Sequence, residues 1–278
     1  MIDLFGDEAY TDQLGIIPSP LNYTGSKFKL FSLIREYFPK SCNTFWDLFC
    51  GGGSVFINSV FDKIVANDII TPLIEFYIFL QSNSWDKVIM AIEERKIPKD
   101  DQDAYIELRK RFNQSKDCID FFMLVCCCTN NMIRFNQKKE FNQTWGQRTF
   151  NSSTEARLRA FHGRLYGNSK ISFLNSDFRK CQVGQGDFVY LDPPYGISDA
   201  GYNTYWSEDD ELALYEYLDV LNACEISFML SNVAEHKGKI NQHLDKLSKY
   251  KIIELPFDYN KVSRSGLSKT KEIIVINY

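Results

Sequence analysis

The 278-residue sequence has few of the features that mark several large classes of protein. It holds only three histidines and eight cysteines, and no two cysteines form a Cys-x-x-Cys pair, so we expect no metal site. No apolar run reaches the roughly 18 residues of a membrane-spanning helix. The first residues lack the basic and apolar regions of a signal peptide. These absences lead us to expect a soluble, cytoplasmic protein.

The excess of one charge sign over the other is also small, because 36 acidic and 32 basic residues leave a net charge of −4. The charges are nevertheless segregated along the chain. Residues 134–170 hold eight basic side chains and two acidic ones, a local charge of +6, whereas residues 199–219 hold seven acidic side chains and no basic one. Such segregation allows a polyanion to bind one face of a net-acidic protein, and ordinary solvated surface charge is the alternative.

What is present is an ordinary globular composition, with 44% hydrophobic and 24% charged residues. Apolar runs predict strands at 44–49, 63–67, 171–174, 188–191, 226–230, 250–255 and 271–277. Helical spacing predicts helices at 27–38, 54–60, 153–166, 208–222 and 238–247, and through 71–128 with breaks near 82–84 and 98. Strands that alternate with helices predict a mostly parallel sheet. The last two strands are separated by a short polar stretch, so they are expected to pair antiparallel.

The first motif that indicates chemistry runs from Asp47 to Ser54, between a strand and a predicted helix. Its three glycines, 51–53, permit a sharp turn and close approach of a ligand to the backbone. The acidic Asp47 suits a cationic group better than a pyrophosphate. Asp68 ends the next strand about 20 residues later, where a carboxylate can bind ribose hydroxyls. The motif therefore favours a neutral or cationic nucleoside over NAD, with a plain tight turn as the alternative.

The second motif is Asp192-Pro193-Pro194-Tyr195, which follows the apolar run 188–191. Two prolines stiffen the backbone and remove its N–H donors, which leaves carbonyl acceptors beside a carboxylate. Tyr195 adds an aromatic plane. This set suits an exocyclic amine, which needs acceptors for its two hydrogens and a surface on which its ring can stack.

Together these motifs resemble the DNA N6-adenine methyltransferases of the α class, also called the Dam-like or D12 class. The resemblance covers roughly residues 20–278 and keeps the order of cofactor motifs, recognition insert and catalytic motif. Further segments that carry it are Asn22–Lys27, Arg134–Asn136, Glu140–Asn142, Asn175–Phe178, Phe228–Asn232 and Lys271–Ile274.

This resemblance implies a fold, a domain division and a cofactor. The fold would be an α/β Rossmann-like sheet of the S-adenosylmethionine-dependent methyltransferases, with an antiparallel C-terminal strand and a mainly helical target-recognition insertion. The catalytic domain would comprise 1–71 and 166–278, and the DNA-binding domain 72–165. The cofactor-binding residues implied by the match are Tyr23, Gly25, Lys27, Asp47, Phe49, Cys50, Gly51, Gly53, Asp68, Asp177, Phe178 and Asp192.

The resemblance also implies roles within these sets. Asp47 and the glycine turn would lie at the methionine end of the cofactor, Asp68 at its ribose, and Asp177 with Phe178 at its adenine. The catalytic residues would be Asp192, Pro193, Pro194 and Tyr195. Asp192 and the Pro193 carbonyl would accept the hydrogens of an adenine amine, and Tyr195 would stack the base after it is flipped from the duplex.

Double-stranded DNA is the implied partner, and the segment after residue 129 would read it. Arg134 would contact guanine. Nearby amide side chains, including those of Asn131 and Gln143, would contact adenine, and basic residues, including Arg157, would contact phosphates. The DNA-binding set is Asn130, Arg134, Asn136, Lys138, Lys139, Asn142 and Arg148. For any single asparagine here a turn role is the alternative. Gln143-Thr144-Trp145-Gly146 departs from the Val-Pro-Phe-Gly of the Dam branch, so a restriction-modification methylase with a short site other than GATC is expected.

Other activities remain as alternatives to adenine methylation. Protein glutamine N5-methyltransferases use Asn-Pro-Pro-Tyr and N4-cytosine methyltransferases use Ser-Pro-Pro-Trp, and neither matches the motif at 192–195. A non-catalytic DNA-binding regulator that keeps the cofactor site is a third possibility. The expected partner enzyme is a cognate restriction endonuclease, and the expected state is a monomer.

Overall fold

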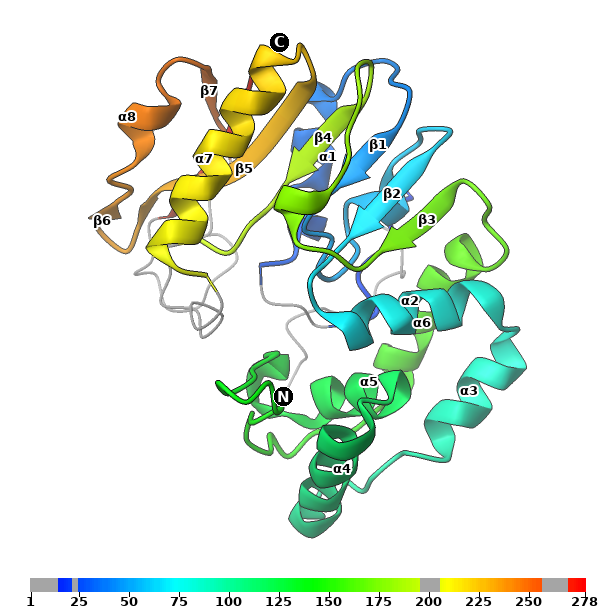
Figure 1. The fold of residues 1–278 in the computed structure, drawn as a ribbon. Helices are drawn as coiled ribbons and strands as arrows, with labels where there is room; N and C mark the ends of the chain where they lie inside the picture. The colour runs from blue at the N-terminus through cyan, green and yellow to red at the C-terminus, as the bar shows by residue number, and fades with distance from the viewer. Residues whose placement is uncertain (1–14, 22–24, 196–205, 257–269) are drawn as a thin grey trace. The chain divides into compact units, whose positions relative to one another are not determined.

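The computed structural model describes residues 15–21, 25–195, 206–256 and 270–278. Contacts within the chain divide it into two compact units (Figure 1). Unit 1 comprises residues 1–29, 50–60 and 70–175, and unit 2 comprises residues 30–49, 61–69 and 176–278. The domain boundaries predicted from the sequence stay a prediction.

Unit 2 is built around a mixed β-sheet. Its main strands run in the order β2-β1-β4-β5-β8-β7, and the short strand β6 pairs with β5. Their bounds are β1 Phe45–Asp47, β2 Ile64–Asn67, β4 Phe188–Leu191, β5 Ser227–His236, β6 Lys239–Ile240, β7 Lys251–Glu254 and β8 Thr270–Ile276. Strands β2, β1, β4 and β5 are mutually parallel. Strand β8 pairs antiparallel with both β5 and β7. The prediction of a mostly parallel sheet with antiparallel C-terminal strands is therefore confirmed.

The central strands are apolar because both of their faces are covered. All four residues of β4 are buried, as expected for a parallel strand inside an α/β fold. An aromatic cluster packs against one part of this sheet, with the Phe45 ring 5.0 Å from Phe61 and 5.5 Å from Phe188. Helix α7, Glu208–Ala223, runs beside β5 (Figure 1) and begins with a capping box made by Ser207 and Asp210. The helix predicted at 208–222 is therefore confirmed.

Unit 1 is mainly helical. Its helices are α2 Thr71–Ser82, α3 Trp85–Glu93, α4 Gln102–Ser115, α5 Cys118–Cys127 and α6 Ser152–Leu165, and the strand β3, Ile171–Leu174, also belongs to it. Helix α5 is buried from Ile119 to Cys127 and forms the centre of this unit. The predicted breaks near 82–84 and 98 are confirmed, and an additional break at residues 116–117 separates α4 from α5.

Two predicted helices are wrong. The expected helix at 54–60 is only the 3-10 turn η3, Phe56–Asn58. In an α-helix the backbone N–H of Asn58 would donate to the Ser54 carbonyl. Here the Asn58 side-chain amide donates to that carbonyl instead, and the Asn58 backbone N–H donates to the Val55 carbonyl. The expected helix at 238–247 is the hairpin strand β6 followed by the short helix α8, Leu244–Leu247.

The hairpin between β5 and β6 has a local cause. Lys237 and Gly238 are its two loop residues, and both have positive φ, 50° and 80°. Positive φ at both central positions is the requirement of a type I′ turn, and glycine adopts it without strain. The predicted helix at 27–38 is likewise shortened, to the successive turns η1 Lys27–Lys29, α1 Phe31–Ile34 and η2 Arg35–Tyr37.

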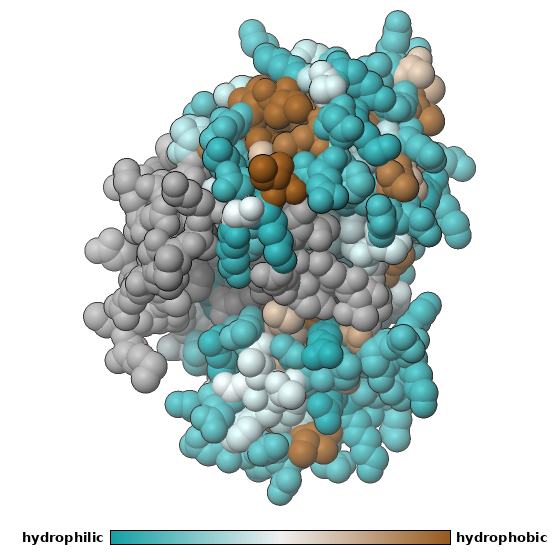
Figure 2. Space-filling view, turned by 90° about the vertical axis from the view of Figure 1, so that its left-hand side faces the viewer, coloured by the Kyte–Doolittle hydropathy of each residue, from teal (hydrophilic) through white to brown (hydrophobic). Residues whose placement is uncertain are grey.

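Among the described residues on the face drawn in Figure 2, hydrophobic residues form separate patches between hydrophilic ones. Scattered apolar residues of this kind are normal on soluble domains. Within the described ranges, no helix combines the length and the apolar character that crossing a membrane requires. In the same ranges, no three His, Cys, Asp or Glu side chains gather as metal ligands.

Candidate active site and nucleic-acid-binding segment

Three acidic residues stand at the ends of neighbouring parallel strands in unit 2. Asp47 is the last residue of β1, Asp68 follows β2, and Asp192 follows β4. Strand β1 lies between the other two, and Asp47 is in register with Ala66 and Tyr190. The chain passes from β1 to β2 on one side of β1, and β4 pairs with β1 on the other side, so the strand order reverses at β1 and this edge is the usual ligand-binding position of an α/β sheet. Asp47 is only 1% exposed, so its carboxylate is a buried acceptor.

Asn67 holds the loops of this edge together. Its amide nitrogen donates to the carbonyls of Leu48, at 2.9 Å, and Ser176, at 3.0 Å. Its Oδ1 accepts from the Ser176 N–H at 3.0 Å. Asn67 therefore joins the segment that carries Phe49 to the segment that carries Phe178. Asn67 was not predicted from the sequence, although an amide as the last residue of a predicted strand, directly before Asp68, could have indicated a residue that braces the loop.

The two aromatic residues predicted to bind the cofactor contact each other. The rings of Phe49 and Phe178 are 5.3 Å apart and inclined by 40°. Phe178 is buried, whereas Phe49 is partly exposed. Asp177 accepts hydrogen bonds from the backbone N–H of Arg179 and from its guanidinium, at 2.6–3.0 Å. The paired Arg179 guanidinium lowers the pKa of Asp177, so this carboxylate is ionised at neutral pH.

The catalytic motif predicted at 192–195 emerges from β4 at the same edge. The Tyr195 hydroxyl donates to Asp192 Oδ1 at 2.9 Å and lies 3.3 Å from Ser231 Oγ. Ser231 is 0% exposed and lies on the neighbouring strand β5. Burial and the negative charge of Asp192 raise the pKa of Tyr195 well above its ordinary value, so its hydroxyl remains a donor. Ser231 belongs to a segment that the sequence analysis noted, but its contact with Tyr195 was not predicted.

The glycine turn belongs to unit 1. Gly51 and Gly53 have φ of 44° and 79°, conformations that other residues rarely adopt. A side chain at Gly53 would stand 2.9 Å from both Phe56 and Phe161, and the Gly51 carbonyl accepts a hydrogen bond from Tyr77. The positive φ angles at both positions and the close packing at Gly53 therefore explain why the turn has glycine at 51 and 53.

The remaining predicted cofactor residues in unit 1 are placed as follows. Cys50 is buried, Lys27 is buried with its Nζ 3.4 Å from the Gly25 carbonyl, and Gly25 is exposed with a φ of 83°. Tyr23 lies outside the described residues. The sequence also contains a second basic strip, Lys261, Arg264, Lys269 and Lys271, for which a contact with the DNA backbone or a solvated loop is expected; of these four, only Lys271 lies within the described residues.

The predicted DNA-binding segment forms a small hairpin in unit 1. Phe135 and Phe141 pair across it as an antiparallel bridge, with their rings 5.7 Å apart. Its exposed predicted residues are Asn130, Arg134, Lys138, Lys139 and Arg148, while Asn136 and Asn142 are partly buried. The hairpin thus presents four cationic side chains to solvent.

Several amide side chains of this region serve the fold. Asn136 accepts from the backbone N–H groups of Lys138 and Glu140 and donates to the Glu140 carboxylate, which makes it a turn residue. Asn131 and Gln143 are buried and donate to backbone carbonyls. These bonds oppose the adenine contacts expected of Asn131 and Gln143. Arg157, expected at a phosphate, is also buried.

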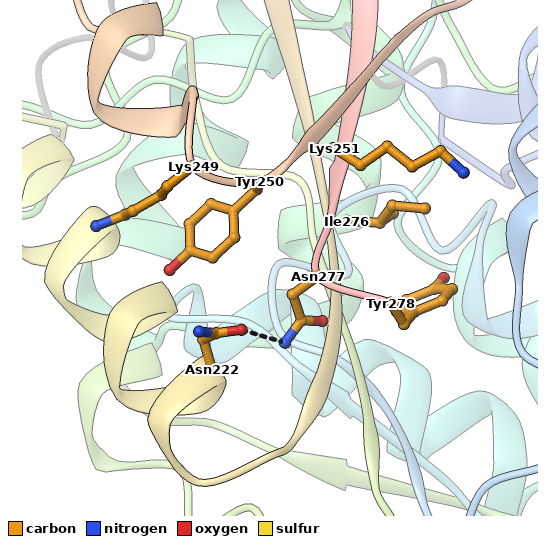
Figure 3. Close-up of a pocket in the computed structure, with 7 residues that line it drawn as sticks. All are labelled: Asn222, Lys249, Tyr250, Lys251, Ile276, Asn277 and Tyr278. Atoms are coloured by element: carbon orange, nitrogen blue, oxygen red, sulfur yellow. Dashed lines mark hydrogen bonds between the residues drawn. The ribbon is translucent and has the colours of Figure 1, made fainter.

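A shallow hollow of about 280 Å³ lies elsewhere in unit 2 (Figure 3). Its lining residues are Asn222, Lys249, Tyr250, Lys251, Ile276, Asn277 and Tyr278. It lies beside the start of β5, at the amino edge of the parallel strands and therefore away from Asp192. The Asn277 amide donates to Asn222 and to the Ile226 carbonyl, and the Tyr278 hydroxyl donates to the Tyr37 carbonyl. The polar groups of Asn277 and Tyr278 are therefore engaged in hydrogen bonds within the fold, and nothing in the lining indicates a ligand.

Comparison with known proteins supplies the family. The model of the D12 class N6 adenine-specific DNA methyltransferases matches residues 23–256. The chain is 34% identical to modification methylase StsI of Streptococcus sanguinis and to type II methyltransferase M.FokI of Planomicrobium okeanokoites, over 94% of its length and 43% of theirs. It is 27% identical to a DNA adenine methylase of Haemophilus influenzae over 92% of both chains.

The chain therefore spans less than half the length of the first two relatives and nearly all of the third. The family match covers the acidic strand ends, the hairpin after residue 129 and the motif at 192–195. The chain belongs to the D12 class of N6 adenine-specific DNA methyltransferases.

Proposed function

We propose that this protein transfers a methyl group from S-adenosylmethionine to N6 of an adenine within a short double-stranded DNA sequence. The observation that carries the proposal is the motif at 192–195, placed after β4 beside the acidic ends of β1 and β2, in a chain of the adenine-specific family. The acceptors that an exocyclic amine needs and the acidic residues that a nucleoside cofactor needs lie at one edge of one sheet.

The acidic and aromatic side chains named in unit 2 fit the cofactor. Asp68 would accept the ribose hydroxyls, Asp47 would face the cationic methionine end, and Phe178 would flank the adenine, to which Asp177 would offer an acceptor. Bound S-adenosylmethionine supplies an electrophilic methyl group. The resemblance also assigns Tyr23, Gly25, Lys27, Cys50, Gly51 and Gly53 to this cofactor, and these assignments stay predictions.

The chemistry of the motif follows from its acceptors. Asp192 and the Pro193 carbonyl would accept the two amine hydrogens, which draws the nitrogen lone pair out of conjugation with the ring and towards the methyl group. The Tyr195 hydroxyl, which donates to Asp192 at 2.9 Å, would hold the carboxylate in this orientation. Positioning and charge stabilisation then supply the rate. No strong base is required, because the nitrogen becomes cationic and acidic as it gains the methyl group, and its surplus proton would then pass to Asp192 or to water.

DNA binding would use the hairpin after residue 129. Its exposed Arg134 would read a guanine with two hydrogen bonds, and the exposed Lys138, Lys139 and Arg148 would contact phosphates. Because the target nitrogen is inaccessible inside a duplex, the adenine would be flipped out and stacked on Tyr195. We place the protein in the cytoplasm as a monomer, where it would protect DNA from a cognate restriction endonuclease, in line with the modification methylases among its relatives.

The test uses the purified chain, labelled S-adenosylmethionine and unmethylated genomic DNA. Mass spectrometry of the digested DNA should detect N6-methyldeoxyadenosine, and sequencing should place it in one short motif. Transfer to N4 of cytosine or to a protein glutamine would refute the proposal. Cofactor binding without transfer to DNA would instead favour a regulator.

A further inference from the structure

Trp206, a residue with no predicted role, belongs to the aromatic group at the carboxyl edge of unit 2. Its ring centroid is 5.7 Å from that of Phe49, with the planes at 79°, and 5.9 Å from that of Phe178. Phe178 is buried, while the residues Phe49 and Trp206 are each partly exposed. The rings of these two residues therefore meet nearly at a right angle over a buried third ring, beside the loop that Asn67 braces.

A buried carboxylate holds the Trp206 indole. The Trp206 Nε1–H donates to Glu211 Oε2 at 2.6 Å, and the Tyr215 hydroxyl donates to Glu211 Oε1. Glu211 is 6% exposed, so both of its oxygens depend on these donors. Burial and the Glu211 charge raise the pKa of Tyr215, which keeps the second donor protonated. An indole held by one strong hydrogen bond has little rotational freedom, and such preorganisation favours ligand binding.

The helix that carries Glu211 is itself attached to the Asp177–Arg179 turn. The Arg179 guanidinium lies 3.1 Å from Asp210 and 2.6 Å from Asp177. Asp210 is also the capping-box residue of α7, bonded to Ser207 directly after Trp206. Hydrogen bonds and ion pairs within unit 2 thus join the start of α7 to Trp206 and to the turn that carries Phe178.

We infer that Trp206 forms a wall of the cofactor's adenine pocket and that Glu211 is the positioning residue that orients it. This inference rests on the proposed use of S-adenosylmethionine. A planar purine lies well against a preformed aromatic surface, and stacking of a base on an aromatic residue accounts for a large part of its affinity. The rings of the partly exposed residues Phe49 and Trp206 offer such a surface, with the acceptor Asp177 in the adjoining turn.

The experiment titrates the protein with S-adenosylhomocysteine and uses isothermal titration calorimetry together with tryptophan emission. We expect Trp206→Ala to raise Kd roughly 5- to 150-fold, the range for loss of one base stack, and Trp206→Phe to restore most of the affinity. The emission change on binding should disappear in Trp206→Phe. It should persist in the matched control Trp85→Phe, which changes another of the four tryptophans, on α3 in unit 1.

A double-mutant cycle tests Glu211. We expect Glu211→Gln to raise the Kd for S-adenosylhomocysteine about threefold and to shift the Trp206 emission of the protein without ligand. It should have no further effect in a Trp206→Phe background, because the indole N–H is already absent. Additive effects would refute the positioning role.

The outcomes separate this inference from the proposed function. If the wild-type protein binds no S-adenosylhomocysteine, the proposed function fails and the inference falls with it. If the wild type binds, and Trp206→Ala leaves Kd unchanged or Trp206→Phe keeps the full emission change, the inference alone is refuted. Trp206→Phe decides the matter even if Trp206→Ala does not fold.

Discussion

The strand-edge site of unit 2 and the hairpin region 129–150 of unit 1 hold their polar groups in opposite ways. At the strand edge, Tyr195, Asp192 and Ser231 contact one another, and Ser231 is fully buried. In the hairpin region, Arg134, Lys138, Lys139 and Arg148 are exposed. Positive φ angles at Asn130, Asn131, Lys139 and Gln147 show a backbone shaped by turns.

The difference follows from what each region is proposed to do. Methyl transfer requires acceptors that are oriented before the substrate arrives, and strand ends provide such rigidity. Groove recognition requires donors that extend from the surface to base edges and phosphates, and a short hairpin provides that reach. Substitutions at the strand edge should therefore change the rate, and substitutions in the hairpin should change affinity and site preference.

The largest effect is expected for Asp192→Asn. The asparagine keeps an oxygen for Tyr195 but replaces the second carboxylate oxygen by an amide donor, which would repel the amine hydrogens. We expect kcat to fall by roughly 10²–10³-fold or more, with the affinity for DNA nearly unchanged. Single-turnover methylation and a DNA-binding titration measure the two quantities. A rate within threefold of wild type would remove Asp192 from the mechanism.

The next largest effect is expected for Arg134→Ala. Loss of a two-point guanine contact should reduce discrimination at one position of the site by about 1–3 kcal/mol, while kcat on saturating cognate DNA changes little. Methylation of a library of site variants measures this discrimination. Lys110→Ala, which removes an exposed cation on α4, is the control and should leave it unchanged. Unaltered site preference in Arg134→Ala would show that its assignment is wrong.

A smaller and sequence-independent effect is expected for Lys138→Ala and Lys139→Ala. Each would remove one phosphate contact, so the slope of log affinity against log salt concentration should decrease in magnitude by about 1 per substitution. Binding titrations between 50 and 200 mM salt, on cognate and unrelated duplexes, measure the slope. A loss confined to the cognate duplex would instead indicate base reading by these lysines.

The smallest effect is expected for Arg179→Gln at the strand edge. The Arg179 guanidinium lowers the pKa of Asp177 below its ordinary value of 3.8, so the pair stabilises the fold above that pH and the contribution is lost as pH falls through the lowered pKa. Because the pair is partly exposed, we expect a loss of only about 0.2–1 kcal/mol at pH 7, which vanishes in strong acid. Urea unfolding at pH 7 and in strong acid measures it. An equal loss at both pH values would contradict the assignment.

The sequence by itself determined the main strands of the sheet, though not the short strand β6, and where the acidic residues stand along them. Continuous apolar runs such as 188–191 are read directly as buried strands, and the order of motifs indicated the family before any coordinates. The family was confirmed by comparison, and the mostly parallel sheet by the structure. These features depend on the order of residues within short segments, and the sequence contains that order directly.

Tertiary structure alone decided which side chains brace the site and which only hold the fold. The hydrogen bonds of Asn67 and Ser231 join segments whose meeting no local pattern predicts. The missing helix at 54–60 also has a tertiary component, because the Asn58 side chain bonds Ile17 from 41 residues away. Burial of Asn131 and Gln143 could not be read from their polarity, since a polar side chain is buried wherever packing supplies its hydrogen-bond partners.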